Sequence, residues 1–292
     1  MTFNPNSDIS GGKASHRGRN TGIAVGGGLG VVALFVLSQF LGVDLTGLLG
    51  GGQGQPPASD SALEQCLTGQ DANERIECRM QGASASLEEY WQEEAPAIGV
   101  EYAGPQNFIL FEQAVATGCG NASSATGPFY CPPDQTIYID TSFYDQLESQ
   151  FGASGGPLAE MYVVAHEWGH HVQNIAGILQ RAQDGQTGPT SNAVRVELQA
   201  DCFAGSWAAA ASSTEDPEGV PFLQPISRDE YAQAIDAAAA VGDDRIQETM
   251  QGQVNPHTFT HGSSEQRMRW FETGYEQGAG ACDTFGVDGS QL

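Results

Sequence analysis

The chain has 292 residues, of which 40% are hydrophobic, and this length can hold one large domain or two small ones. Its 36 acidic and 11 basic residues give a formal net charge of −25, and Lys13 is the only lysine. A surface of this charge repels phosphate backbones, so the composition argues against nucleic acid as a partner.

A long segment without charges follows the first 21 residues. Residues 22–42 have the length of the ~20 helical residues that cross a bilayer core. The alternative is a cleaved signal peptide, whose apolar region normally has about 7–15 residues and ends at a small-residue cleavage site. The segment is longer than that and has no evident site of this kind. We therefore predict an uncleaved transmembrane helix over residues 22–42.

The charges around this segment predict its orientation. Lys13, Arg17 and Arg19 precede it, and the next basic residue is Arg75. The positive-inside rule places residues 1–21 in the cytoplasm as a tail, and everything after the span on the other side. We therefore predict a single-pass protein of the cell membrane, attached by its N-terminal helix, with an extracytoplasmic domain.

Residues 43–60 are rich in glycine and proline, which predicts a flexible linker and places the folded domain at residues 61–292. All six cysteines lie in this domain, and an even number in an exported domain favours disulfides over free buried thiols. No C-x-x-C pair occurs, which argues against a thiolate zinc site. Proximity in the chain predicts the disulfides Cys66–Cys78 and Cys119–Cys131. Elimination then predicts Cys202–Cys282 as the third.

The pattern of apolar residues predicts a mostly helical α+β domain with a small sheet near its start. Strands are expected at 107–115 and 136–140, on either side of a loop rich in Gly, Ser and Cys at 117–135. One helix should begin at Pro157, because proline is favoured at the first helical position. The other helices are expected at 61–94 with a break near Gly69, and at 142–152, 192–212, 227–241 and 262–278, the last with a capping box of Ser263 and Gln266.

Three of the six histidines lie close together in the helix that begins at Pro157. His166, Glu167 and His170 form the pattern H-E-x-x-H, and because four residues make about one helical turn, both histidines point from the same face. Two imidazoles placed in this way can bind one Zn²⁺, and Glu167 can reach a water beside the metal. The neighbouring His171 points elsewhere, which favours a structural or surface role.

A catalytic zinc site usually has a third protein ligand. Glu197 and Asp201 are four residues apart in the predicted helix 192–212, so they share one face. We predict Glu197 as the third ligand, with Asp201 accepting the distal N–H of a ligand histidine, His166. The alternative is that both are solvated charges, but their helix is otherwise apolar, and buried carboxylates need partners.

The oxyanion that forms when water attacks an amide carbonyl needs a further donor. His261, which lies just before the predicted capping box, is the leading candidate, ahead of Arg267 and Tyr162. The alternative for His261 is a local role in the loop or cap.

These motifs resemble the bacterial family of putative neutral zinc metallopeptidases, whose members are membrane-anchored. The resemblance implies that His166, His170 and Glu197 bind zinc and that Glu167 is catalytic. It also implies a zincin-type fold with a short sheet over the active-site helix. The matching segments span about residues 60–285 and are GPFYCPPDQTIYIDTSFY, VVAHEWGHHVQ, VELQADCFAGSWA and FTHGSSEQRMRWF.

The sequence therefore predicts a membrane-anchored zinc peptidase that acts on peptides or proteins with Glu167 as general base. By the same resemblance to zincins, the strand at 136–140 would line the cleft and pair with an extended substrate. Two alternatives remain, which are a non-catalytic membrane-tethered scaffold that keeps zinc for stability and a hydrolase of another amide, such as a cell-wall cross-link. The oligomeric state does not follow from the sequence.

Overall fold

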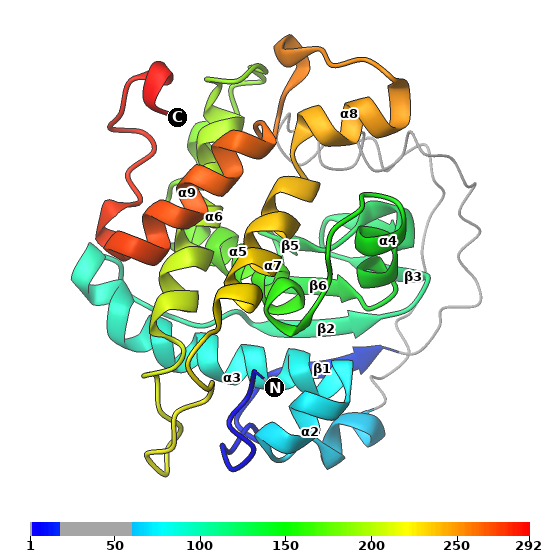
Figure 1. Ribbon diagram of the computed structural model, residues 1–292, viewed down its shortest axis with the longest axis vertical. Coiled ribbons are helices and arrows are strands. Elements are labelled where there is room, and N and C mark those ends of the chain that lie inside the picture. The colour runs from blue at the N-terminus through cyan, green and yellow to red at the C-terminus, as the bar shows by residue number, and fades with distance from the viewer. Residues whose placement is uncertain (1, 18–59) are drawn as a thin grey trace.

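The computed structural model describes residues 2–17 and 60–292 as a layer of helices packed against a small sheet (Figure 1). The strands are β1 (Ala14–Arg17), β2 (Asn107–Phe111), β3 (Ala114–Thr117), β4 (Gly120–Ser123), β5 (Phe129–Cys131) and β6 (Thr136–Asp140). The α-helices are α2 (Gly69–Glu74), α3 (Ile76–Glu94), α4 (Phe143–Ser149), α5 (Pro157–Ile175), α6 (Asn192–Ala210), α7 (Arg228–Ala240), α8 (Asp243–Gln251) and α9 (Ser264–Gln277).

Four strands form a mixed sheet in the order β1–β2–β6–β5. The pairs β1–β2 and β2–β6 are parallel, whereas β5 runs antiparallel to β6, with Tyr130 opposite Ile137. Strands β2 and β6 are almost entirely buried, as expected for strands covered on both faces. Strands β3 and β4 form a separate hairpin.

The position of β6 corrects one prediction. Residues 136–140 do form a strand, but β6 pairs with β2 on one side and with β5 on the other. Thr136–Tyr138 have partner strands on both sides, so the backbone of these residues is not free to pair with a substrate at the edge of a cleft.

Two glycines explain how closely α6 and α9 pack. A Cβ atom on Gly274 of α9 would overlap the backbone carbonyl of Cys202, and one on Gly205 of α6 would overlap that of Phe271. Only glycine leaves room for two helix backbones at this distance. Helix α5 also packs against α6, and α9 contacts α5 through the rings of Phe271 and Tyr162, so the three helices pack against one another (Figure 1).

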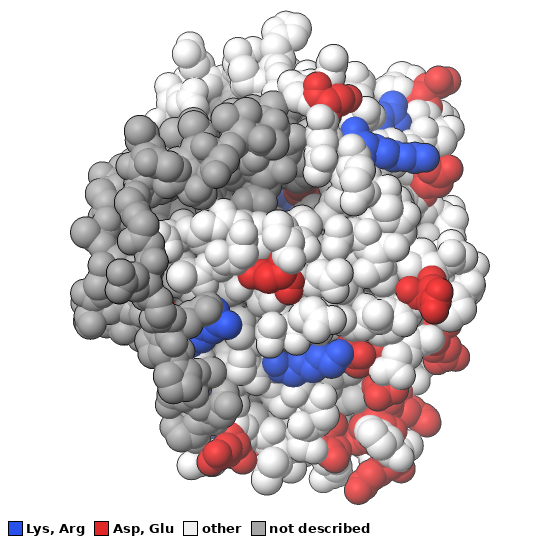
Figure 2. All heavy atoms as spheres, turned by 180° about the vertical axis from the view of Figure 1, so that it is seen from behind, with Lys and Arg blue, Asp and Glu red and all other residues white. Residues whose placement is uncertain are grey.

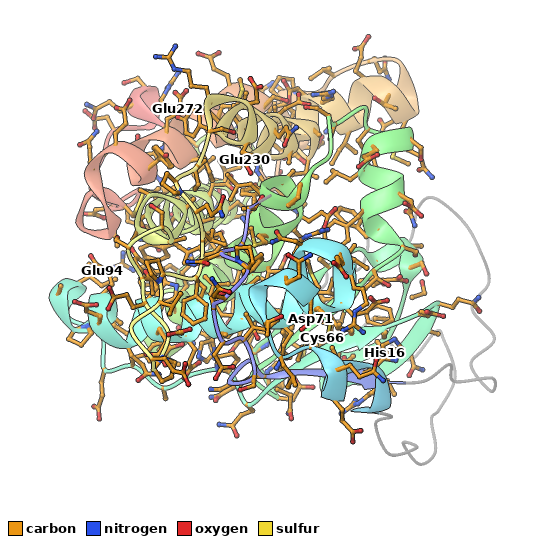
Figure 3. All side chains as sticks on the ribbon, turned by 60° about the horizontal axis from the view of Figure 1, so that its bottom comes forward. His16, Cys66, Asp71, Glu94, Glu230 and Glu272 are labelled. Atoms are coloured by element: carbon orange, nitrogen blue, oxygen red, sulfur yellow. A yellow bond between two sulfur atoms is a disulfide. The ribbon has the colours of Figure 1, made fainter. Side chains whose placement is uncertain are left out.

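The N-terminal segment, residues 2–17, is part of the folded domain. Phe3 and Ile9 are fully buried in the main core, and the Thr2 hydroxyl donates a hydrogen bond of 2.8 Å to Glu230, which is labelled in Figure 3. Strand β1 then pairs along β2, and Lys13 forms an ion pair of 3.0 Å with Glu88.

This segment corrects the predicted membrane topology. Among residues 2–17 and 60–292, no helix is both long and apolar enough to cross a bilayer. The predicted span at 22–42 and the linker at 43–60 lie outside the described residues. Because β1 and β2 pair in one sheet, residues 14–17 and the domain lie on the same side of any membrane. The predicted single-pass localisation, with a cytoplasmic tail and an extracytoplasmic domain, is therefore wrong.

The predictions for the domain itself agree with much of the structure. All three predicted cysteine pairs are disulfide-bonded. Helix α5 begins at Pro157, and Ser263 forms the predicted capping box with Gln266. The predicted strand 107–115 is in fact two strands, β2 and β3, and the predicted loop 117–135 contains β4 and β5. Helix α8 was not predicted.

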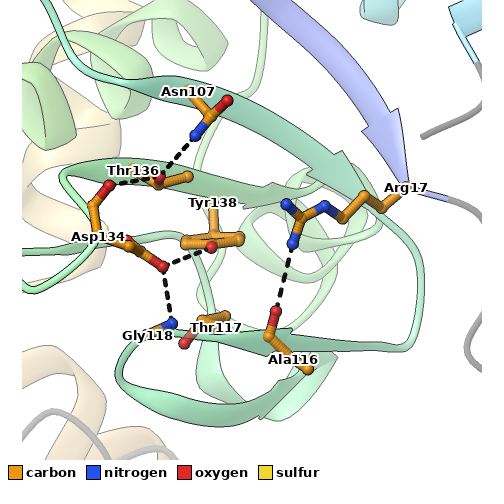
Figure 4. Close-up of a pocket in the computed structure, with 8 residues that line it drawn as sticks. All are labelled: Arg17, Asn107, Ala116, Thr117, Gly118, Asp134, Thr136 and Tyr138. Atoms are coloured by element: carbon orange, nitrogen blue, oxygen red, sulfur yellow. Dashed lines mark hydrogen bonds between the residues drawn. The ribbon is translucent and has the colours of Figure 1, made fainter. Parts of the chain in front are cut away.

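The N-terminal strand also lines a cavity of about 390 Å³ between the sheet and the β3–β4 hairpin (Figure 4). The Arg17 guanidinium donates to the carbonyl of Ala116 on the β3–β4 hairpin. Asp134 accepts hydrogen bonds from the Tyr138 hydroxyl at 2.8 Å and from the backbone N–H of Gly118 at 2.7 Å. These contacts connect the hairpin to the sheet.

Acidic side chains are more prominent than basic ones on the face shown in Figure 2. This distribution follows from the excess of Asp and Glu in the composition. The expectation that nucleic acid is not a partner stays a prediction.

The buried N-terminus makes a testable prediction about stability. Phe3→Ala should lower the free energy of unfolding by about 3–5 kcal/mol, the usual cost of removing a phenyl ring from a core. Asn6→Ala, in the same segment but exposed, should change it by less than about 0.5 kcal/mol. Urea denaturation of both variants measures this difference, and equal stability of the two would show that residues 2–17 are not part of the core.

Candidate metal centre

Three side chains from two helices meet at the crossing of α5 and α6. His166 and His170 lie one turn apart on α5, and Glu197 faces them from α6. The Nε2 atom of His166 is 3.2 Å from one oxygen of Glu197, and that of His170 is 3.5 Å from the other. One ligand atom from each residue lies within 4.8 Å of the others, a spacing that a single metal ion can bridge.

The chemistry of these donors fits zinc. Two imidazoles and one carboxylate are a common set for a catalytic zinc site, and three protein ligands leave a coordination position open. All three side chains are buried, with Glu197 only 3% exposed. Burial opposes ionisation of Glu197, but the neighbouring His170 and His261 hold its pKa well below the usual value. The group therefore presents an ionised carboxylate between two imidazoles.

Asp201 lies behind the first histidine. One of its oxygens, Oδ1, is 2.8 Å from Nδ1 of His166 and accepts a hydrogen bond of 2.6 Å from the Tyr162 hydroxyl. Burial alone would lower the pKa of His166, but the charge and hydrogen bond of Asp201 raise it to about 9. This contact keeps a proton on Nδ1 and holds the ring so that Nε2 faces Glu197.

Arg267 neutralises Asp201. Its guanidinium donates to both carboxylate oxygens, at 2.8 and 2.9 Å, and its remaining Nη1 donates to the carbonyl of Val241. Arg267 and Tyr162 were weaker candidates for the oxyanion donor. The structure places neither in that role, because the donors of both side chains are directed to Asp201 or to the backbone.

Glu167 lies beside this group but is not part of it. Its side chain is 7% exposed. Burial raises the pKa of Glu167 to about 7, and the charge of Glu197 acts in the same direction, whereas His166 opposes it. A carboxylate in this state can exchange a proton near neutral pH.

His261 reaches the centre from the loop before α9. The carboxylate of Asp243 accepts the backbone N–H groups of Thr260, His261 and Gly262 and lies 3.2 Å from Nδ1 of His261. Asp243 therefore fixes both the loop and the ring. No sequence pattern indicated this carboxylate, because it belongs to the first turn of α8, which was not predicted.

Gln173 is a second residue that sequence reasoning missed. Its side-chain oxygen lies 2.9 Å from Nδ1 of His170, on the side of the ring away from Glu197. The only signal in the sequence is its spacing, three residues after His170 on the same helical face. His171, in contrast, contacts the Tyr130 hydroxyl and the carbonyl of Ala103, in a structural role.

Comparison with known proteins identifies the family. The model of the putative neutral zinc metallopeptidase family matches residues 5–285, nearly the whole chain. The chain belongs to this family. Its relatives include the uncharacterized protein Rv2575 of Mycobacterium tuberculosis, which is 49% identical over 257 residues, or 85% of each chain. The uncharacterized protein YpfJ of Escherichia coli is 38% identical over 266 residues, covering 89% of this chain and 87% of the relative.

No solved structure matches this chain. The zincin-type fold therefore stays an expectation from the family resemblance. The family match begins at residue 5, within the N-terminal segment that is packed on the domain.

The contacts of Asp201 predict how the metal centre and the fold respond to its loss. Asp201→Asn should lower zinc affinity about 10–100-fold, because the variant no longer enforces the tautomer of His166. It should also cost about 3–5 kcal/mol of stability, because Arg267 becomes a buried charge without a partner. Zinc affinity is measured by competition with a chelator, and stability by urea denaturation.

A second variant separates the two effects. Adding Arg267→Met removes the unpaired charge, so the double variant should recover stability but not zinc affinity. Unchanged zinc affinity in Asp201→Asn would show that the contact with His166 does not support metal binding.

Proposed function

We propose that this chain is a zinc-dependent peptidase that hydrolyses peptide bonds of peptides or proteins, with Glu167 as general base. The position of Glu167 is the observation that supports this most. It follows His166 directly on α5, is buried, and lies outside the His166–His170–Glu197 group. A zinc site that served stability alone would not need a second carboxylate beside it that binds no metal and has a pKa raised to about 7.

His166, His170 and Glu197 would hold the metal ion. When bound there, zinc supplies Lewis-acid chemistry, since it polarises a carbonyl and lowers the pKa of water. The protein fixes the ligands beforehand, through Asp201 behind His166 and Gln173 behind His170. Prior orientation of this kind lowers the cost of forming the site.

Glu167 would move the proton of the reaction. It accepts a proton from the attacking water as the new C–O bond forms, and it gives that proton to the amine as the C–N bond breaks. The carboxylate thus ends in its starting state. Its burial limits exchange with bulk solvent, which helps it keep the proton between the two steps.

We assign to His261 the hydrogen bond to the oxyanion. Asp243 lies at Nδ1, so Nε2 is the ring atom left to face a substrate. Burial opposes protonation of His261, but the charges of Glu197 and Asp243 raise its pKa. In its protonated form the ring carries hydrogen on both nitrogens, and Nε2 can donate.

The alternative amide hydrolase would use the same residues, so only substrates distinguish it. The purified chain should be incubated with a peptide library and, separately, with a cross-linked cell-wall fragment. We expect cleavage of peptides that a zinc chelator abolishes and added zinc restores. Cleavage of the cell-wall fragment alone would replace the peptidase proposal with the amide alternative.

The variant Glu167→Gln distinguishes a zinc peptidase from a non-catalytic scaffold that binds zinc. This variant keeps the shape of the side chain but loses its basic carboxylate, so zinc content should stay near that of the parent. Peptide turnover should fall by about 10²–10⁴, the usual contribution of general acid–base catalysis. Glu197→Gln is the contrast, because it removes a proposed ligand and should lose zinc and activity together. Full activity in Glu167→Gln, or loss of its zinc, would contradict the role given to Glu167.

His261→Ala tests the oxyanion donor. We expect kcat to fall by about 10²–10³ while zinc affinity stays within a few-fold of the parent value. The matched control is His257→Ala, an exposed histidine of the same loop, which should leave kcat unchanged. An unaltered kcat in His261→Ala would restrict His261 to a structural role.

A further inference from the structure

His170 does not have a charged partner like that of His166. Its Nδ1 atom lies 2.9 Å from the side-chain oxygen of Gln173, a residue that is completely buried. An amide can turn either its oxygen, which accepts a hydrogen bond, or its nitrogen, which donates one, towards the ring. The two ends have nearly the same shape, so both orientations fit the same space. Which nitrogen of His170 carries the proton therefore depends on which end of the Gln173 amide faces the ring.

The other contacts of Gln173 decide that question. The second atom of its amide lies 2.7 Å from the backbone carbonyl of Val196 on α6. A carbonyl only accepts hydrogen bonds, so the atom that faces it must be the amide nitrogen. The oxygen then faces His170, which has to carry its proton on Nδ1. The lone pair of Nε2 is left pointing towards Glu197, 3.5 Å away.

A second buried amide repeats this arrangement. The Gln173 nitrogen also donates to the side-chain oxygen of Gln199, at 3.1 Å. The nitrogen of Gln199 donates in turn to the carbonyl of Cys282, at 2.8 Å, and this carbonyl again fixes the orientation of the amide. Cys282 is held in place by its disulfide to Cys202, on the same helix as Gln199.

We propose that Gln173 and Gln199 form an amide relay, running from the Cys282 carbonyl to Nδ1 of His170, that fixes His170 in the tautomer able to bind a metal ion. Gln173 is a positioning residue in this relay, since it acts through His170. It also holds α6 at Val196, the residue before Glu197, so one amide places two of the three ligands. The proposal rests on the zinc site of the proposed function, but not on catalysis.

The experiment measures zinc affinity by chelator competition in three variants. Gln173→Met keeps the length of the side chain but removes both ends of the amide, and it should weaken zinc binding about 10–100-fold. Gln199→Met should weaken it less, because the Val196 carbonyl still orients Gln173. The double variant should bind zinc as Gln173→Met does, since Gln199 acts only through Gln173.

The tautomer is observed directly in the metal-free protein. Histidine side-chain ¹⁵N spectra should show His170 of the parent with hydrogen on Nδ1 and not on Nε2, and Gln173→Met should show a mixture. This measurement needs neither zinc nor activity. A chain that showed this tautomer and bound zinc through the relay, but cleaved no peptide, would overturn the proposed function and leave the relay standing.

The matched control is Gln81→Met. Gln81 is also a buried glutamine with backbone contacts, to Ser10, Gly12 and Ala14, but it holds the N-terminal segment. Its loss should lower stability and leave zinc affinity unchanged.

Three results would overturn the relay. In the first, Gln173→Met binds zinc as tightly as the parent. In the second, the losses of zinc affinity in the two single variants multiply in the double variant. In the third, His170 of the metal-free parent carries hydrogen on Nε2. If Gln173→Met fails to fold, the ¹⁵N spectrum of the parent and the zinc affinity of Gln199→Met still test the relay.

Discussion

The buried charge pair between Asp201 and Arg267 holds three helices in one arrangement around the candidate metal centre. Asp201 is fully buried and Arg267 is 3% exposed, so either charge would be very costly without the other. The guanidinium contacts both carboxylate oxygens, and the same carboxylate also binds Tyr162 and His166. Because these side chains come from α5, α6 and α9, a shift of any one helix would separate buried charges from their partners.

The packing around this pair makes that arrangement possible. Gly205 and Gly274 let α6 and α9 approach until their backbones touch, which brings Arg267 within reach of Asp201. The disulfide of Cys202, next to Asp201 in the chain, ties α6 to the segment after α9. The two histidines are supported differently within this frame. His166 has an anionic partner, whereas His170 has a neutral amide, and burial lowers the pKa of His170 to about 4.

Local patterns predicted many elements of this fold, and long-range pairing produced most of the errors. The start of α5 at Pro157 and the capping box at Ser263 depend on neighbouring residues, so the sequence shows them directly. The position of β1 depends on pairing with β2, more than ninety residues later, and no local signal reveals it. Lys13 and Arg17 were interpreted as charges flanking a membrane helix. In the structure they contact Glu88 and a backbone carbonyl of the domain.

The sequence by itself determined the residues that share a helical face, because helical periodicity is local. It placed His166 with His170 and Glu197 with Asp201, and with them the chemistry of a zinc site. Apart from Asp201, which the sequence placed behind His166, the tertiary structure decided which side chains support those ligands. Asp243 and Arg267 reach the site from α8 and α9, and Gln199 contacts Gln173 from α6. Their roles depend on distances of about 3 Å across helix crossings, which no spacing along the chain encodes.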